Sequence, residues 1–233
     1  MKTNEVLVSL TEKYIERHYA VDPVTRQKTA DPALDVMQGA VRAARKAAEA
    51  CVVKATEIRS NRLNCEIGNE LAVARASRKL CEAASKELDQ AREKVERFVG
   101  DLMKKISAPA EPNDVIAESR EAELRAALGK LDHRARAQRI SEAIRAEDNP
   151  LIGAVLRGRA IVTGIEPAEL EGYRAAWQRV RVPAEVDRIS RLKSALKDLD
   201  RTGRLFKNFM DGIADQNAVR RAEQLESGSQ VHA

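Results

Sequence analysis

The chain has 233 residues, of which 41 are basic and 36 acidic, so its formal net charge is +5. Hydrophobic residues make up 43% of it, but aromatic residues only 3%, and much of the apolar fraction is alanine. Because alanine buries little surface, this composition argues against a single thick core and favours long, thin helical packing. Basic and acidic residues are mixed along the chain, as on solvated helix faces, and no segment is a basic tail.

The N-terminus and the cysteines indicate a protein of a reducing compartment. The first twenty residues carry acidic side chains within their apolar part and have no small-residue cleavage site, so we expect no signal peptide. No apolar run approaches the roughly 20 residues of a membrane span, so we expect a soluble protein. Cys51, Cys65 and Cys81 have no disulfide-like or zinc-like spacing, and we interpret them as small buried side chains.

Residues 1–31 are predicted to form an amphipathic arm followed by a linker. Apolar side chains recur at helical spacing through residues 4–19. Two prolines, Pro23 and Pro32, then interrupt the pattern, and no period connects them.

Residues 32–108 are predicted to form a long helical, coiled-coil segment. Asp31 before Pro32 is typical of an N-cap followed by a proline in the first turn. Apolar residues then recur every seven positions in two seams that are out of phase, and the shift falls within residues 59–69. One continuous helix with a stutter and a helical hairpin both fit, and we favour the continuous helix. Because the seams are poor in bulky residues, the segment must pack against the rest of the chain or against other copies.

Short helices are predicted for residues 113–182 and one long helix for 183–226, before a polar tail at 227–233. The starts of the short helices are marked by Asp, Asn or Glu and in two cases by a following proline. The whole chain is therefore expected to be all-α. Four aromatic residues form the densest bulky group. We expect them to build the C-terminal core, with an exposed partner-binding surface as the alternative: Trp177, Tyr173, Phe206 and Phe209.

The segment DNPLIGAVLRGRAIVTGIEP, residues 148–167, has three glycines and two arginines between two prolines. It does not match a phosphate-binding loop, because five residues separate Gly158 from Gly164 and no Lys-Ser/Thr pair follows. We interpret it as a connection between helices, with one or both of these glycines at positive φ. Arg157 and Arg159 are expected to be exposed near a helix end and to contribute little stability, with an anion site as the alternative.

No catalytic or metal-binding pattern is found in the sequence. His18, His133 and His232 are far apart, and no nucleotide or hydrolase motif is present, so we expect neither an enzyme nor a cofactor. Unspecific contact with phosphate or nucleic acid is the remaining hypothesis for the basic residues, since acidic residues dilute them and no aromatics interleave. The candidates are Arg157, Arg159, Arg181, Arg188, Arg191 and Lys193.

The segment LRAALGKLDHRARAQRISEAIRAEDNPLIGAVLRGRAIVTGIEPAELEGYRAAW, residues 124–177, combines a Leu-Asp helix start, an Arg-bearing helix, an acidic turn and a final Thr-Gly-hydrophobic step. This order resembles uncharacterised helical proteins encoded among tailed-phage and prophage head genes, over roughly a quarter of the chain. The resemblance implies a virion-associated structural or assembly protein and offers no catalytic residues.

The expected function is therefore that of a non-enzymatic structural protein of a tailed phage, in the head, neck or ejection apparatus. It would act by helix–helix association with itself and with other virion proteins, after synthesis in the cytoplasm of a bacterial host. The alternative is a bacterial cytoplasmic helical protein that associates with nucleic acid.

Overall fold

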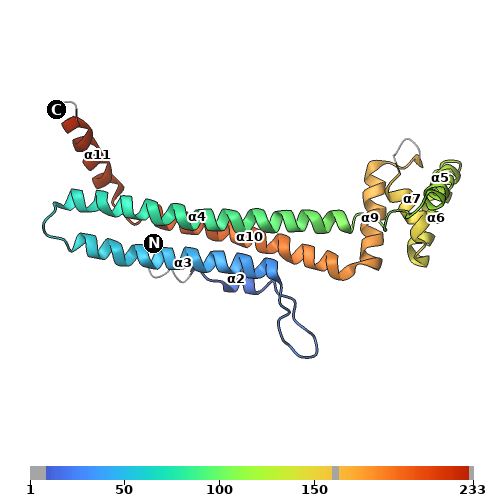
Figure 1. Ribbon diagram of the computed structural model, residues 1–233, viewed down its shortest axis with the longest axis horizontal. Coiled ribbons are helices and arrows are strands. Elements are labelled where there is room, and N and C mark those ends of the chain that lie inside the picture. The colour runs from blue at the N-terminus through green and yellow to red at the C-terminus, as the bar shows by residue number, and fades with distance from the viewer. Residues whose placement is uncertain (1–8, 159–162, 231–233) are drawn as a thin grey trace. The chain divides into compact units, whose positions relative to one another are not determined.

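A computed structural model describes residues 9–158 and 163–230 (Figure 1). Within these ranges the regular elements are helices, with a single isolated bridge between Val21 and Lys28, so the predicted all-α fold is confirmed. No helix among the described residues is long and apolar enough to cross a membrane. The chain forms two compact units: residues 1–98 with 191–233, and residues 99–190.

The first unit is built from one short helix and longer helices. These are α2 (Lys13–Glu16), α3 (Pro32–Arg59), most of α4 (Glu66–Lys105), most of α10 (Pro183–Asp211) and α11 (Gln216–Gln230). As predicted, Asp31 caps α3: its carboxylate accepts a hydrogen bond from the amide of Ala33 at 3.1 Å, and Pro32 occupies the first turn.

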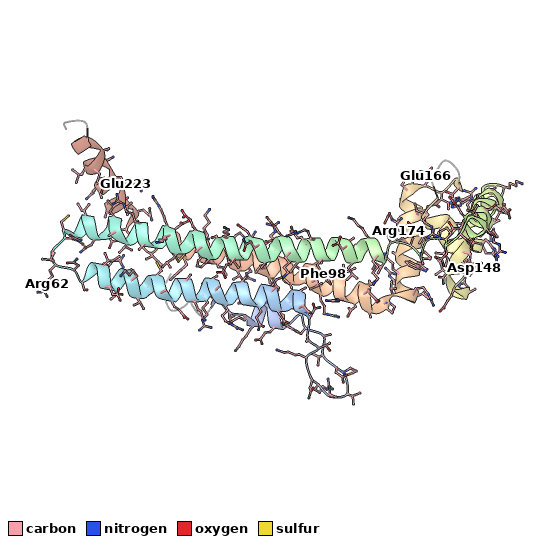
Figure 2. The ribbon with its side chains drawn as sticks, viewed as in Figure 1. Arg62, Phe98, Asp148, Glu166, Arg174 and Glu223 are labelled. Carbon is pink, nitrogen blue, oxygen red and sulfur yellow. The ribbon has the colours of Figure 1, made fainter. Side chains whose placement is uncertain are left out.

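The favoured single helix through residues 59–69 is wrong, because α3 and α4 form a helical hairpin (Figure 1). Hydrogen bonds from asparagine side chains stabilise the turn. Asn61 Oδ1 accepts from the amide of Leu63 at 3.0 Å, and Asn69 Nδ2 donates to the carbonyl of Asn61 at 3.0 Å. The turn therefore needs neither glycine nor proline, since amide side chains bond the backbone groups that a helix end leaves open. Figure 2 shows Arg62 at this turn.

The chain's own helices cover the two seams. Ser77 of α4 donates to the carbonyl of Met210 in α10 at 2.8 Å, and Ala55, Ala74, Val219 and others bring α3, α4 and α11 into one core. The seam positions of α4 that are buried in this way are Ala74, Ala84, Leu88, Ala91 and Val95. The packing partners that the poor seams require are therefore supplied within one chain.

The predicted long C-terminal helix is interrupted. α10 ends at Asp211, and Asp215 then caps α11 by accepting from the amides of Asn217 at 2.8 Å and Ala218 at 3.3 Å. The amide of Asp215 donates to Oε2 of Glu70 at 2.8 Å. The Glu70 carboxylate of α4 therefore stabilises the break between α10 and α11. The sequence of residues 183–226 alone does not predict this break, because Glu70 lies outside that range.

The cysteines only partly follow the interpretation as buried small side chains. Cys51 is buried, Cys81 is half-buried and Cys65 is exposed. The difference follows from the hairpin, because Cys65 lies in the turn just before α4, where its sulfur accepts from the amide of Gly68 at 3.4 Å.

The second unit consists of short helices around α7. They are α5 (Val115–Gly129), α6 (His133–Ala146), α7 (Asn149–Leu156) and α9 (Pro167–Arg181). Residues 151–156 of α7 are all buried, and α5, α6 and α9 each pack against this helix. The core is aliphatic, with one indole: Leu128, Ile140, Ile144, Leu151, Ile152, Val155, Leu156, Ile165 and Trp177.

The predicted helix starts in this unit are correct to within one residue. Asp114, Asp132 and Asp148 cap α5, α6 and α7, each by accepting from the backbone amide three residues beyond. At the end of α5, Gly129 belongs to the helix and Lys130 follows it in the right-handed region. At the end of α6 the left-handed residue is Glu147, with φ 58°.

The prediction that one or both glycines in the connection between α7 and α9 have positive φ is confirmed at one of them. Gly164 has φ +63°, whereas Gly158 is not left-handed. Gly158 is needed for a close approach instead, because a Cβ there would lie 2.8 Å from the carbonyl oxygen of Ala154 and 2.6 Å from Cγ2 of Thr163. Arg159 lies outside the described residues.

Candidate functional site

The four aromatic residues do not form one group. Trp177 and Tyr173 belong to the second unit, whereas Phe206 and Phe209 belong to the first. Trp177 is 5% exposed and Phe206 is fully buried, so an exposed surface made by these two side chains is excluded. Helical spacing correctly placed them on inner faces, but it cannot tell which of two cores a helix joins.

The predicted basic residues are largely engaged within the chain. Arg157 pairs with Glu121, Arg181 pairs with Glu147, and neither Arg188 nor Arg191 is without a partner. Lys193 is exposed. These residues therefore do not form the continuous stripe of unpaired positive charge that phosphate binding requires.

A charged cluster lies beside the core of the second unit. The guanidinium of Arg157, at the end of α7, donates two hydrogen bonds to the Glu121 carboxylate of α5, one of them at 3.4 Å, and Arg125 donates to the same carboxylate at 3.4 Å. The Glu121 side chain is only 8% exposed and that of Arg157 21%. The expectation of an exposed Arg157 is therefore wrong. The cause is a partner 36 positions away in the sequence.

The segment between α4 and α5 is held against this cluster by three side-chain donors. Arg157 donates to the carbonyl of Pro109 at 2.5 Å, Arg174 to that of Ser107 at 2.9 Å and Gln178 to that of Ile106 at 2.8 Å. Arg174 is labelled on α9 in Figure 2. The loop therefore has a fixed course although it contains no regular structure.

This loop, α5, the start of α7 and the end of α9 enclose a recess with a volume of about 430 Å³. That volume lies within the range of ligand sites in proteins. The side chains around it are largely apolar, with four charged groups. The lining residues are Ala108, Pro109, Ala110, Pro112, Ala117, Arg120, Glu121, Asn149, Pro150, Arg157, Trp177, Arg181 and Val182.

The indole of Trp177 is the unusual member of this lining. Its Nε1 is buried, and it has no hydrogen-bond partner among the described residues. A buried donor without an acceptor costs about 1–3 kcal/mol, and nearly all buried polar groups in proteins are paired. The Trp177 side chain lines the recess, but its unpaired Nε1 has essentially no accessible surface.

Positive charge exceeds negative charge in the recess. Arg120, Arg157 and Arg181 line it, but Arg157 is paired with Glu121 and Arg181 with Glu147, so the excess comes from Arg120. Arg120 lies on the exposed side of α5, and no acidic partner is assigned to it. This excess is local, because residues 99–190 contain fifteen basic and fifteen acidic residues.

Val115 and Ile116, in the first turn of α5, are 80% and 66% exposed. They precede the lining residue Ala117 in the sequence, but neighbouring positions of a helix point to different faces, and neither side chain lines the recess.

A second recess, of about 510 Å³, lies between α4 and α10 in the first unit and has a different character. Its charges are balanced, with Glu82, Asp89 and Asp200 against Arg92, Arg204 and Lys207. Arg92 already contacts Asp200 at 3.6 Å. It therefore has no charge preference that would select a ligand.

Two histidines contact carboxylates, which the sequence did not indicate. His18 Nε2 lies 2.6 Å from Asp198 in the first unit, and His133 Nε2 lies 2.6 Å from Glu169 in the second. Burial raises the pKa of Asp198, but hydrogen bonds from His18 and Arg17 outweigh this and lower it overall. The first pair fastens the end of the N-terminal arm to α10, and the second joins the starts of α6 and α9. His232 lies outside the described residues.

No group of three His, Cys, Asp or Glu side chains in the described part of the chain is arranged to hold a metal ion. The residues that distinguish the recess are Trp177, Arg120 and Glu121, of which the sequence singled out only Trp177. One signal was present for Glu121: it lies seven residues before the buried Leu128, and therefore on the inner face of α5. No protein-family model, curated protein or solved structure matches this chain.

Proposed function

We propose that this protein is a non-enzymatic binding protein of a tailed-phage particle or of its assembly, and that its second unit carries the binding surface. The observation that carries the proposal is a preformed recess of about 430 Å³ whose lining includes Trp177 and the exposed Arg120. The resemblance to phage head-gene proteins over residues 124–177 lies within the same unit.

The groups around the recess support binding rather than chemistry. The Glu121 carboxylate is committed to Arg157 and Arg125, and Arg157 also holds the loop at Pro109. These charged groups therefore fix the shape of the recess, while the exposed Arg120 remains for an incoming molecule.

The first unit serves in this proposal as a stable helical support. The sequence predicts self-association through the seams of residues 32–108, but the chain's own helices bury those seams. The proposed contacts are therefore with other virion proteins, after synthesis in a bacterial cytoplasm.

The test has two parts. Particles purified from a host that carries the gene should contain this protein by mass spectrometry. A photo-crosslinking amino acid at the exposed Val115 of α5, in the second unit, should link to another virion protein, whereas the same group at the exposed Val53 of α3 should not. Absence from particles, or equal crosslinking from both positions, contradicts the proposal.

Nucleic-acid association is the weaker alternative, because Arg157 and Arg181 are paired with carboxylates. We expect DNA binding to be weak. Tight binding whose logarithm falls with log salt by about 0.9 per phosphate neutralised would favour that alternative.

A further inference from the structure

We propose that the N-terminal arm, residues 9–19, is exchanged between two copies of this chain, so that each arm binds the first unit of the other copy. The side chains that hold the arm within its own chain are called the arm site. They are Asp35, Gln38, Arg42 and Arg45 of α3 and Asp198 of α10. The inference concerns the first unit and does not depend on the binding surface proposed for the second.

The arm is held by buried apolar side chains and by charged pairs. Leu10 and Ile15 are fully buried. The Glu12 carboxylate lies 3.2 Å from Nε of Arg42 and 3.9 Å from Nη1 of Arg45. A detached arm exposes both apolar side chains to water and loses these pairs, so the arm is stable only when it occupies an arm site.

The end of the arm is bound to two helices. Arg17 Nη2 and His18 Nε2 lie 2.7 and 2.6 Å from Oδ2 of Asp198 in α10. Glu16 accepts a hydrogen bond from Gln38 of α3 at 3.1 Å. Partners on two helices fix the position and the direction of the arm, and a second copy offers the same partners in the same arrangement. An exchanged arm therefore keeps these contacts.

The loop between α2 and α3 can open at little cost. Figure 1 shows it projecting from the start of α3, and residues 20–30 include no buried side chain. Backbone hydrogen bonds close the loop on itself. The amide of Asp22 donates to Gln27 at 2.9 Å, and that of Thr29 donates to Ala20 at 2.8 Å. Because these groups lie at the surface, water replaces the bonds when the loop opens.

The closed loop holds Arg26 in an unfavourable backbone conformation. Its φ is 59°, a left-handed value that residues with a Cβ seldom adopt. The amide of Arg26 donates to the carbonyl of Asp22 at 2.9 Å, so the residue lies within the tight turn. Opening the turn relieves this conformation. The extended loop then spans about 30 Å, which is enough to carry the arm to an adjacent copy.

A second copy is the partner that these observations favour, because the arm site has one occupant of known fit, which is the arm itself. Two copies that exchange both arms form a closed pair, as in domain swapping. The pair needs no new contact surface. It gains the relief of two strained loops and loses the freedom of two separate molecules, so the fraction of pairs rises with protein concentration.

The test uses two variants of the whole chain, each with one new cysteine. Glu12→Cys places it in the arm and Arg42→Cys in the arm site, and in both variants Cys65 and Cys81 are replaced by serine, while the buried Cys51 remains. The two variants are mixed, concentrated, warmed and treated with a short bismaleimide. We expect a crosslinked pair with one chain of each variant, identified by its mass, because neither variant alone has both cysteines.

Three further variants serve as controls. Arg62→Cys, at the hairpin turn and the opposite end of α3, replaces Arg42→Cys and should give no mixed pair. The double variant Glu12→Cys/Arg42→Cys should crosslink within one chain at high dilution.

The loop is tested by its own pair of substitutions. Arg26→Val should raise the association constant of the pair at least about tenfold, because a β-branched residue tolerates a φ of 59° still less than arginine does. Gln27→Val changes the next position, where φ is not positive, and should leave the constant unchanged.

The inference is overturned if the mixture gives no mixed pair while the double variant crosslinks within one chain. Equal crosslinking with Arg62→Cys would overturn it too, because random collisions would then explain the pairs. A double variant that does not crosslink would show that the arm does not occupy the arm site. Equal association constants for Arg26→Val and Gln27→Val would remove the strained loop as the cause of exchange.

Discussion

The two units bury their helices with different side chains. In the first, α3 presents mostly small residues to the core, such as Ala40, Ala44 and Ala48, over 28 residues. In the second, the eight-residue α7 buries Leu151, Ile152, Val155 and Leu156. Small side chains let long helices approach closely and spread the stabilisation over many positions, whereas bulky ones concentrate it. The comparison indicates that single positions matter most in the second unit.

Ile152→Ala should have the largest effect. Ile152 is 2% exposed, and its truncation leaves a cavity in the core of the second unit, at a cost of roughly 2–5 kcal/mol. Urea unfolding followed by Trp177 fluorescence measures this, because the only tryptophan lies in the same core.

The matching substitution in the first unit is Val41→Ala, also at a buried position. It removes two methylene equivalents and should cost about 2 kcal/mol, read by circular dichroism, with little shift of the fluorescence transition. If Val41→Ala moves the fluorescence midpoint as far as Ile152→Ala does, the two units unfold as one and the comparison is broken.

Arg157→Gln should be next, at about 2 kcal/mol in the fluorescence transition. Removing Arg157 leaves Glu121 nearly buried with only the 3.4 Å contact to Arg125, and it frees the Pro109 carbonyl. A fully buried pair costs more to break, but partial exposure of Arg157 reduces the loss. Arg134→Gln, exposed on the same unit, is the control and should be neutral. A neutral Arg157→Gln would restore the sequence-based expectation of an exposed arginine.

Gly164→Ala should cost about 1–2 kcal/mol, because φ +63° is unfavourable for any residue with a Cβ. The new Cβ would also lie 2.8 Å from Nη1 of Arg136, the group that donates to the Gly164 carbonyl. Gly172→Ala is the matched control: it lies in α9, has nothing within 4 Å of the added Cβ, and should be neutral or slightly stabilising. Equal melting temperatures for the two variants would contradict a backbone role for Gly164.

The features that the sequence predicted and those that it missed differ mainly in how far apart in the chain the interacting residues lie. Asp31 and Asp132 were found as helix starts, and Asp114 as one of two candidates with Asn113, because capping involves residues only a few positions apart. The hairpin was considered, but the continuous helix was favoured, because the turn is stabilised by asparagine hydrogen bonds and not by glycine or proline. The pair of Arg157 with Glu121 was missed because the partners are 36 positions apart.

The site was predictable to the same limited extent. Trp177 was recognised as a bulky inward residue, but its unpartnered Nε1 depends on the positions of α5, α7 and the loop before α5. Helical periodicity gives the face on which a residue lies and not the atoms that meet it. Glu121 was detectable as a charge on an apolar face, and Arg120 beside it was not distinguishable from the many exposed arginines.

The smallest effect is expected from acid at the pair of Glu70 and Arg59 in the first unit. Glu70 accepts from Arg59 at 2.5 and 3.0 Å, and this pairing holds the pKa of Glu70 below its ordinary value of 4.5 in the folded state. A lowered carboxyl pKa stabilises the fold fully above the unfolded value, and the contribution is lost as pH falls through the folded value. Because Arg59 is 44% exposed, solvent screens the pair and the loss of stability should be smaller than for the substitutions above.

The Glu70→Gln variant lacks the titrating carboxyl group and its pH-dependent contribution to stability. Between about pH 6 and pH 3 its urea midpoint, measured by circular dichroism, should therefore fall less than that of the wild type. The Trp177 transition should show no such difference between the two proteins. A Glu70→Gln midpoint that falls as steeply as the wild type's would show that the pair does not set the acid sensitivity of the first unit.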